Sequence, residues 1–508
     1  MNFERRHFIK MAVSASLATL PALGAAAVET GAEAVPFDAG ALAEMARALS
    51  KKPYKAAATD LPDPFNNLPY EQYVGIRRRT DAIIWGGDNI GFALEPLHRG
   101  YLFGTPMTIY LVENGMAQRL AYDPSKYDFG RITPPGTLAD IGFSGFRVLQ
   151  PRDGEGLAEL AIFQGASFFR SLARGQNLGT MARALALRTA DPRGEEFPMI
   201  RAMWIERPVL ANGTLVMHAL IDSESMVGAY RFTLRPGEAN IIDTECTLFA
   251  RVLVDHIGLG AMTATYLYGP IDRRRSDDLR PGVYEANGLQ MLTGKGEWLW
   301  RPVANRENLQ ISGFVDNNPR GFGFLQRDRD FDRFQDDDQH WERRPSLWVE
   351  PIGDWGEGIV QLVEIPSDSE VNDNIIAYWR PKAPMSAGSE ASFAYRQFWC
   401  WSPPERSPLA SVSGSRGGRG SQGKKRRFAI DFSHEMFGDA QRNFDIKPAL
   451  TAQPGTISSL RTFLSRERKT FRVFFEIDPG SEAYCEMRLV LESAGKPLSE
   501  TWLYRWTV

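Results

Sequence analysis

The sequence predicts an all-β protein, with a large antiparallel β-sandwich followed by a small immunoglobulin-like β-sandwich. Two observations lead to this fold class. Short runs that alternate between apolar and polar residues recur along the 508 residues, and 46 glycines and 32 prolines interrupt them at close intervals. Helix-period patterns are sparse after the first part of the chain, so the crossover helices that an open parallel sheet requires are not predicted.

The first 27 residues have the pattern of an export signal. Arg5 and Arg6 precede a weakly hydrophobic run at residues 11–23, and the three alanines at 25–27 are the small residues that a signal peptidase prefers. The run is too short to span a bilayer, and no later segment is long and apolar enough to do so. We therefore expect a twin-arginine signal peptide at residues 1–27, a periplasmic location and no membrane insertion.

The large sandwich is expected over residues 35–402. Asp38 precedes an apolar stripe at helical spacing, which predicts one short helix at the start of this domain. Residues 108–112 and 116–122 alternate on either side of Asn114 and Gly115, a pair typical of two-residue hairpin turns. Further strands are predicted at residues 215–221, 229–234 and 241–254.

The composition changes after the large sandwich. Residues 403–427 are rich in glycine, serine and arginine and too polar to bury, which predicts a linker or mobile loop between two domains. Alternating apolar runs return after this segment and are separated by turn residues. We therefore expect an immunoglobulin-like β-sandwich domain at residues 428–508.

Charge and composition exclude several classes of partner. The chain has 59 lysines and arginines against 62 aspartates and glutamates, a net charge of −3, so neither nucleic acid nor anionic lipid is favoured. The three cysteines are far apart and predict no disulfide framework. The six histidines lack the spacing of metal ligands. We expect a neutral partner, no metal site and no cofactor.

Residues 318–379 interleave carboxylates, arginines and tryptophans more densely than a β-rich core requires. Indole faces stack on the C–H faces of sugar rings, while carboxylates and guanidinium groups bind hydroxyls. This chemistry indicates a glycan-binding site with Trp348, Trp355, Trp379 and Arg344 among its binding residues. The other interpretation, β-turns and surface ion pairs around half-buried tryptophans, explains the same residue types equally well.

A pair of carboxylates is the kind of catalytic site that the sequence patterns do not exclude. The Gly-x-Ser-x-Gly pattern of serine hydrolases is absent, and no cysteine has the flanks of a nucleophile. Asp373 lies between Asn372 and Asn374, directly before an apolar run whose burial would raise the pKa of a carboxyl group toward that of a general acid. The pattern alone favours a structural Asn-Asp-Asn turn over a catalytic acid.

Several blocks, in one order, resemble the periplasmic glucan biosynthesis protein G/D family. The blocks are Glu195-Glu196-Phe197-Pro198, Asn318-Pro319-Arg320-Gly321-Phe322-Gly323, Arg343-Arg344-Pro345-Ser346, Gln361-Leu362-Val363-Glu364-Ile365-Pro366 and Asn372-Asp373-Asn374-Ile375. The resemblance extends from Phe37 to Trp502. It implies a galactose-mutarotase-like β-sandwich followed by an immunoglobulin-like domain, and an activity on osmoregulated periplasmic glucans. Members are inverting glycoside hydrolases of β-1,2-glucan, and some form homodimers.

The resemblance also implies roles for two carboxylates. Asp373 takes the position of the family's general acid, which reverses the preference that the pattern alone gives. Glu285, ahead of Asn287-Gly288-Leu289, takes the position of the family's base, which is an aspartate that acts through a relay of waters. The extra methylene displaces the carboxylate, and such a displacement weakens a positioned proton relay.

Three functions therefore stay open. The chain is expected to be an inverting endo-hydrolase of the β-1,2-glucan backbone. The glutamate at the base position also fits a transglycosylase or cyclising enzyme on the same backbone, or a non-catalytic glucan-binding scaffold in which Glu285 is an ordinary loop residue.

Overall fold

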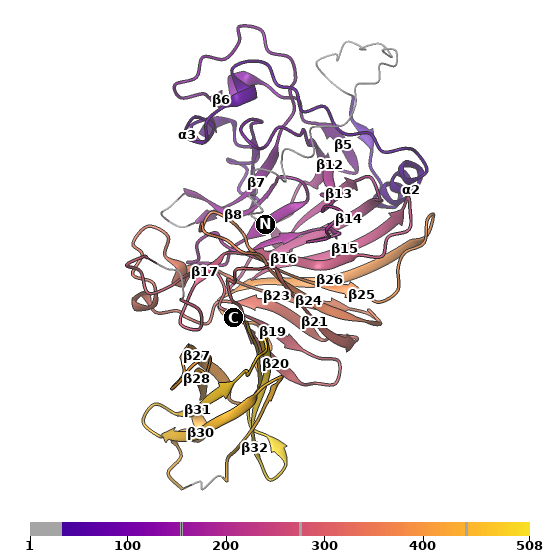
Figure 1. The fold of residues 1–508 in the computed structure, drawn as a ribbon. Helices are drawn as coiled ribbons and strands as arrows, with labels where there is room; N and C mark the ends of the chain where they lie inside the picture. Colours follow the sequence, from indigo (N-terminus) through magenta and orange to yellow (C-terminus); the bar gives the residue numbers. More distant parts are fainter. Residues whose placement is uncertain (1–32, 153, 155, 274–276, 442–444, 508) are drawn as a thin grey trace.

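The computed structural model describes residues 33–152, 154, 156–273, 277–441 and 445–507, so the signal peptide expected at residues 1–27 lies outside the described part. Two large sheets form the body of the molecule, and the C-terminal strands form a smaller sandwich at one end of it (Figure 1). Nearly all of the regular structure is β, and most neighbouring strands are antiparallel. The predicted fold class is confirmed.

The first sheet has sixteen strands among the described residues, and β33 (Lys496–Pro497) pairs with β32 beside its main path. In spatial order the other strands are β1 (Val35–Pro36), β5 (Met116–Arg119), β4 (Thr108–Glu113), β12 (Met199–Glu206), β13 (Leu215–Asp222), β14 (Met226–Arg235), β15 (Asn240–Ala250), β26 (Glu390–Cys400), β23 (Ser346–Ile352), β22 (Gly321–Leu325), β19 (Gly288–Leu292), β20 (Trp298–Pro302), β34 (Thr501–Thr507), β32 (Tyr484–Ser493) and β29 (Lys447–Gln453).

The second sheet has ten strands among the described residues, and β11 (Ala186–Leu187) pairs with β16 beside its main path. In spatial order the other strands are β21 (Gln310–Asn317), β24 (Glu357–Glu364), β25 (Ile375–Pro381), β16 (Ile257–Ala264), β10 (Met181–Arg183), β9 (Phe168–Ser171), β8 (Gly156–Gln164), β7 (Gly145–Arg152) and β3 (Ala93–Leu97). Among the described residues, the neighbouring strands of this sheet are all antiparallel.

The remaining elements are short or belong to the C-terminal sandwich. The small sheets are β17 (Tyr266–Tyr268) with β18 (Val283–Tyr284), β2 (Arg77–Arg78) with β6 (Tyr127–Asp128), and the four strands β27 (Ser411–Arg419), β28 (Arg426–Ser433), β31 (Thr470–Asp478) and β30 (Thr456–Ser465). The helices are α2 (Ala39–Ser50), α3 (Tyr70–Tyr73) and the 3-10 turns η1 (Phe65–Asn67), η2 (Thr80–Ala82), η3 (Pro124–Lys126), η4 (Leu210–Asn212), η5 (Phe331–Arg333), η6 (Trp341–Arg343) and η7 (Glu435–Gly438).

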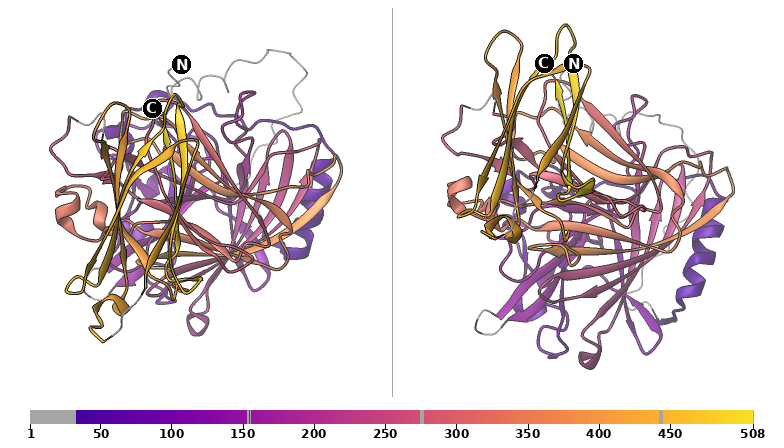
Figure 2. Two further views of the ribbon diagram at one scale, coloured as in Figure 1. Left: turned by 60° about the horizontal axis from the view of Figure 1, so that its bottom comes forward. Right: turned by 90° about the horizontal axis from the view of Figure 1, so that it is seen from below.

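The main hydrophobic core lies between the two large sheets. Residues such as Phe163, Phe232 and Met262 pack there, because alternate side chains of each strand point toward the facing sheet. The predicted N-terminal helix is α2, whose cap Asp38 accepts a hydrogen bond from Gly40 N at 3.0 Å. It packs on the outer face of the sixteen-stranded sheet, against strands β12 to β15 (Figure 2). The body therefore has two sheet layers and a helix on one outer side.

The predicted hairpin and central strands are confirmed. Asn114 and Gly115 join β4 to β5 and both have positive φ, 52° and 76°, the geometry of the turn that suits the strand twist. The three runs predicted at residues 215–221, 229–234 and 241–254 are strands β13, β14 and β15, in consecutive antiparallel register.

The linker predicted at residues 403–427 needs correction, because Ser411–Arg419 forms strand β27 and pairs with β28. β27 is an edge strand with hydrogen-bonding partners on one side, so its polar, glycine-rich composition is tolerated. Arg416 binds Asp431 across the pair at 2.7 Å. Gly417 lies so close to Ile271 O that a Cβ would meet that oxygen at 2.9 Å. Glycine here permits close packing of β27 on the large body.

The C-terminal sandwich shares a sheet with the body. Strand β34 pairs in parallel with β20, with Trp300 opposite Trp502. The carboxylate of Glu500, which is fully buried, accepts hydrogen bonds from Arg327 Nη1 and Nη2 at 2.6 and 3.0 Å and from Val412 N at 2.6 Å. The two parts are therefore joined by backbone pairing and by a buried ion pair.

The three cysteines are free and buried. Burial raises the pKa of the Cys246 and Cys400 thiols to about 12 and that of the Cys485 thiol to about 11. They lie in the two hydrophobic cores and pack there as small apolar residues.

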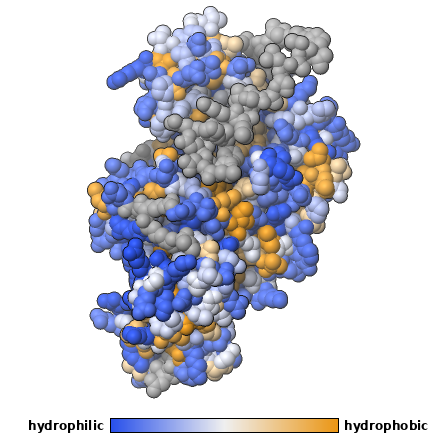
Figure 3. Space-filling model, viewed as in Figure 1, coloured by the Kyte–Doolittle hydropathy of each residue, from blue (hydrophilic) through white to orange (hydrophobic). Residues whose placement is uncertain are grey.

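The face of the molecule in Figure 3 is mostly hydrophilic, with smaller hydrophobic patches near its middle. None of the helices in the described residues is long and apolar enough to cross a membrane.

The junction between the two parts predicts a large stability effect. We expect Glu500→Gln to lower the free energy of unfolding by about 3–5 kcal/mol, because it removes the fully buried carboxylate that compensates the largely covered Arg327 guanidinium. Glu405→Gln is the matched control, since Glu405 pairs with Arg320 at 3.3 Å but is about half exposed, and its loss should cost no more than about 1 kcal/mol. Urea unfolding followed by tryptophan fluorescence measures both. Equal effects of the two substitutions would contradict this account of the junction.

Candidate active site

The candidate site is built around the point where β16 continues into β17. On one side β25 pairs with β16, and Asn374 N donates to Ala264 O at 3.1 Å. On the other side β18 pairs with β17, and Glu285 N donates to Thr265 O at 2.9 Å. Asp373 and Glu285 thus reach the same short stretch of backbone from opposite sides, although more than eighty residues separate them in the sequence.

The two asparagines of the Asn-Asp-Asn block hold the turn. Asn374 is buried, donates to Ile365 O at 3.0 Å and accepts from Tyr266 N at 2.8 Å through its side chain. Asn372 Nδ2 donates to Ser367 Oγ at 3.2 Å. The structural turn favoured by the pattern is therefore present. The side chains of the two asparagines hold it, so the Asp373 carboxylate is not needed for that role.

The Asp373 carboxylate is half-buried and faces two threonines. Thr263 Oγ1 donates to Asp373 Oδ2 at 2.8 Å. Thr265 Oγ1 lies 3.4 Å from Asp373 Oδ1 and 3.0 Å from Asn372 O. Since a hydroxyl has one hydrogen and the carbonyl is nearer, Asp373 Oδ1 is left open to a ligand.

Glu285 is buried beside the same threonine. Its Oε2 accepts from Thr265 N at 3.2 Å, and its Oε1 lies 3.9 Å from Arg344 Nη1. Burial, and then the negative charge of Asp373, raise the pKa of Glu285 to about 7, whereas Arg344 opposes the rise. The negative charge of Asp373 and the burial thus both disfavour ionisation of Glu285.

Arg344, predicted from the sequence to bind sugar hydroxyls, lies beside Glu285, and its position is fixed by contacts within the protein. It donates to Leu178 O and, at 2.7 Å, to Gln339 Oε1, and its guanidinium carbon lies 5.0 Å from the ring centre of Trp341. These contacts aim the positive charge at Glu285. Arg344 therefore tunes the buried carboxylate, and its Nη1 and Nη2 donors are engaged by protein acceptors.

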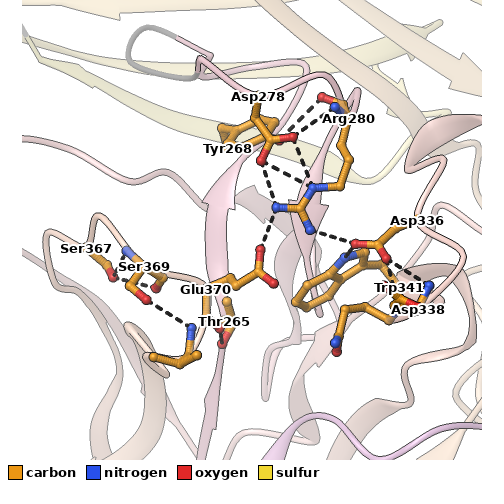
Figure 4. A network of polar contacts seen from close by, with 12 residues as sticks. Thr265, Tyr268, Asp278, Arg280, Asp336, Asp338, Trp341, Ser367, Ser369 and Glu370 are labelled. Atoms are coloured by element: carbon orange, nitrogen blue, oxygen red, sulfur yellow. Dashed lines mark hydrogen bonds and ion pairs between the residues drawn. The ribbon is translucent and has the colours of Figure 1, made fainter.

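An arginine clamp ties together the three segments that surround the site (Figure 4). Arg280 binds Asp278 of its own loop at 2.7 Å, Asp336 at 2.6 Å and Glu370 at 2.6 Å. Glu370 lies three residues before Asp373, and Asp336 also accepts from Trp341 Nε1 at 2.9 Å. One guanidinium thus fixes the approach to Asp373 and the segment that carries Arg344.

The predicted tryptophans are not at the site. Trp348 and Trp379 are 1% and 0% exposed, and Trp355 is 5% exposed. Trp355 and Trp379 pack in the core between the sheets, and Trp348 stacks on Trp298 in the second core. The prediction that these three residues bind sugars is therefore wrong, because their indole faces are covered by protein.

Several residues of the site were not predicted from the sequence. Thr263 and Thr265 hold the carboxylates, and Arg280 organises the surrounding segments. A usable signal exists for the threonines, because two polar residues at i and i+2 within the apolar run 257–268 place both hydroxyls on one face of a strand. Arg280 has no such signal, since its three partners come from separate segments.

The described residues contain no group of three or more histidines, cysteines, aspartates or glutamates placed to hold a metal ion.

Comparison with known proteins shows the family. The model of the family described as "Periplasmic glucan biosynthesis protein, MdoG" matches residues 37–506. Glucans biosynthesis protein G of Vibrio cholerae is 43% identical over 480 residues, which are 93% of this chain and 87% of that protein. Glucans biosynthesis protein G of Rhodopseudomonas palustris is 40% identical over 502 residues, 98% of this chain and 99% of that protein. The chain belongs to this periplasmic glucan biosynthesis family.

The buried Glu285 predicts a stability gain that depends on pH. The folded-state pKa is raised to about 7 from an ordinary value of 4.5, so the folded state is penalised for carrying this charge as pH rises from about 4.5 to 7 and above. We expect Glu285→Gln to raise the free energy of unfolding at pH 8 by up to about 3 kcal/mol and to have little effect at pH 4, where the carboxyl is protonated in both states.

Thermal denaturation at the two pH values measures this difference. Glu238→Gln, at an exposed position, serves as the control and should change stability equally little at both. A gain from Glu285→Gln that is the same at pH 4 and pH 8 would contradict the charge penalty.

Proposed function

We propose that this protein is a periplasmic glycoside hydrolase of glucan biosynthesis that cleaves β-1,2-glucan backbones internally, with inversion at the anomeric carbon. Family membership supports the role in periplasmic glucan biosynthesis. The β-1,2 linkage and the inverting outcome rest on the resemblance of the sequence blocks. Export by the twin-arginine route is part of the same proposal.

One observation carries the catalytic part of this proposal, namely that a half-exposed carboxylate and a buried carboxylate of raised pKa both contact Thr265. Inverting hydrolysis needs one protonated carboxyl at the leaving oxygen and one carboxylate that activates water, roughly 6.5–9.5 Å apart. Two carboxylates beside one threonine, one of them with a pKa raised to about 7, supply the pair of groups that this chemistry uses.

The contacts favour Asp373 as the acid. Its Oδ1 is the open carboxylate oxygen, so it can deliver a proton to a glycosidic oxygen while Thr263 holds Oδ2. Glu285 is then the base that takes a proton from the attacking water, directly or through further waters, and the Arg344 charge stabilises its ionised form. The proton lost by Asp373 and the proton gained by Glu285 balance over the cycle.

A transglycosylase is the second candidate, and the burial of Glu285 is the observation that favours it. Glu285 is 8% exposed, so its contact with bulk solvent is small, and a water from solvent is a weakly activated competitor of a bound sugar hydroxyl. A sugar hydroxyl that occupies the acceptor position would be deprotonated in place of water. The product would then carry a new glycosidic linkage instead of a new reducing end.

Asp373→Asn tests the acid. We expect it to slow shortening of linear β-1,2-glucan by about 10²–10⁴-fold, because an amide cannot protonate the leaving oxygen. Chromatography of the products together with a reducing-end assay measures the effect. Asp368→Asn is the matched control, since Asp368 is exposed on the same segment, and it should retain full activity.

The outcomes separate the functions. Shortening by Asp373→Asn at the parent rate would remove Asp373 from the mechanism. Products of the parent protein with new linkages and no new reducing ends would identify the transglycosylase. No change of the glucan by the parent protein would leave a binding role.

The pH dependence of the rate tests the base. If Glu285 accepts the proton, the active form is ionised, and the rate should fall as pH drops below about 7. Glu285→Gln should remove this acidic limb along with most of the activity. A rate that instead falls as pH rises through about 7 would show that Glu285 is the proton donor and exchange the two roles.

A further inference from the structure

One face of the ten-stranded sheet continues from Asp373 to the far edge of the body. A row of paired residues that begins at Thr263 runs across six strands, from β16 to β3. Thr263 pairs with Met181, Ile162 pairs with Arg170 on one side and Arg147 on the other, and Arg147 pairs with Glu95. Ala182 pairs with Phe169, so Met181 and Arg170 are neighbours in this row. The adjacent residues Val148, Ala161 and Phe169 pack in the core between the sheets, so the row faces outward.

A cavity of about 330 Å³ lies at the far end of this face. Its floor is made by strands β3, β7 and β8, and its other side by α3 and the residues that follow it. The lining includes Tyr73, Ile76, Leu97, Arg147, Glu159 and Gln164. A volume of this size lies within the range of pockets that bind small molecules.

The polar groups of the cavity are balanced in charge. Arg147 lies between two carboxylates, 3.0 Å from Glu95 and 3.1 Å from Glu159. The Glu159 Oε1 atom is shielded from water and accepts no hydrogen bond from the described residues. The Glu159 side chain as a whole is 23% exposed, so its carboxylate can accept a hydrogen bond from a ligand hydroxyl. The guanidinium groups of Arg77 and Arg147 offset the carboxylates of Glu95 and Glu159, so the chemistry suits a neutral polyhydroxylated ligand.

Exposed aromatic rings stand beside the cavity. Tyr101 stacks on Tyr73 with ring centres 6.2 Å apart, and Tyr70 lies 5.5 Å from Tyr101. Tyr101 and Tyr70 are 40% and 55% exposed, in contrast to the buried tryptophans of the sequence prediction. Amphipathic rings with one open face are the groups on which sugar rings stack.

We propose that this cavity, together with Tyr70 and Tyr101, is a saccharide-binding site that holds a part of the glucan chain distant from the bond at Asp373. The inference rests on the proposed function. Thr263 and Arg147 are four strands apart, about 19 Å at about 4.8 Å per strand, so only a chain of several units reaches both places. In this proposal the glucan chain lies along the outward-facing row between them, which includes Met181 and Arg170.

The test is a binding measurement in the Asp373→Asn background, which keeps the glucan intact. Calorimetric titration is done with linear β-1,2-glucan oligosaccharides, from the disaccharide upward. We expect affinity to rise with length in the background protein, and Tyr101→Asn to weaken binding of the long members by about fivefold to tenfold without changing that of the short ones. Asparagine is chosen because Tyr101 has a φ of 52°, which asparagine accommodates.

A second variant and a control complete the design. Glu159→Gln keeps the shape of the cavity and should reproduce the length-dependent loss, since it halves the acceptor capacity of that side chain. Tyr484→Asn replaces a tyrosine of the C-terminal sandwich that is 39% exposed, and it should bind every length as the background does. The melting temperature of each variant shows that it is folded.

Two results would overturn the inference. If Tyr101→Asn and Glu159→Gln bind long oligosaccharides as tightly as the background, the cavity is no saccharide site, and the proposed function at Asp373 is unaffected. If the background protein binds no oligosaccharide of any length, both the cavity site and the proposed function fail.

Discussion

The spacing of the two carboxylates depends on one continuous stretch of backbone from β16 to β17. This stretch is paired on both sides, with Asn374 N bonded to Ala264 O and Glu285 N bonded to Thr265 O. Because β-sheet hydrogen bonds set the distance between neighbouring strands, the separation of Asp373 and Glu285 is fixed by the sheet itself. Rotation of either side chain is further limited by Thr263 and Thr265. In the proposed hydrolysis this rigidity favours proton transfer, since small displacements have large effects on rate.

Charge balance is the second constraint on this region. Arg344 offsets part of the penalty of burying Glu285 beside Asp373, and Arg280 compensates three carboxylates at the rim. The segment that carries Arg344 is also held by Arg280. Asp336 of this segment binds Arg280, and Trp341, five residues later, packs against Arg344. The position of the rim segments and the protonation of the buried carboxylate are thus physically linked.

The sequence predicted local features well and long-range ones poorly. The α2 helix, the β4–β5 hairpin and strands β13 to β15 follow from periodicity and turn residues, which act over a few positions. The resemblance placed Asp373 and Glu285, the residue pattern pointed to Arg344 as a sugar-binding residue, and the structure brings these three together. The tryptophans could not be assigned, because the same indole serves a core or a sugar surface, and burial alone distinguishes the two. Strand β27 was missed because its edge position removes the need for apolar residues. The Arg280 clamp depends on tertiary proximity that no local pattern encodes.

The burial of all three thiols determines how the protein responds when it passes from a reducing to an oxidising compartment. At neutral pH a thiol whose pKa is raised to about 11 or 12 is almost entirely protonated, so the thiolate that attacks disulfides or oxidants is scarce. Folding consumes no oxidant, and the finished fold presents no accessible thiol to one. The same native state is therefore attainable under reducing and oxidising conditions, and passage from one to the other requires no thiol chemistry.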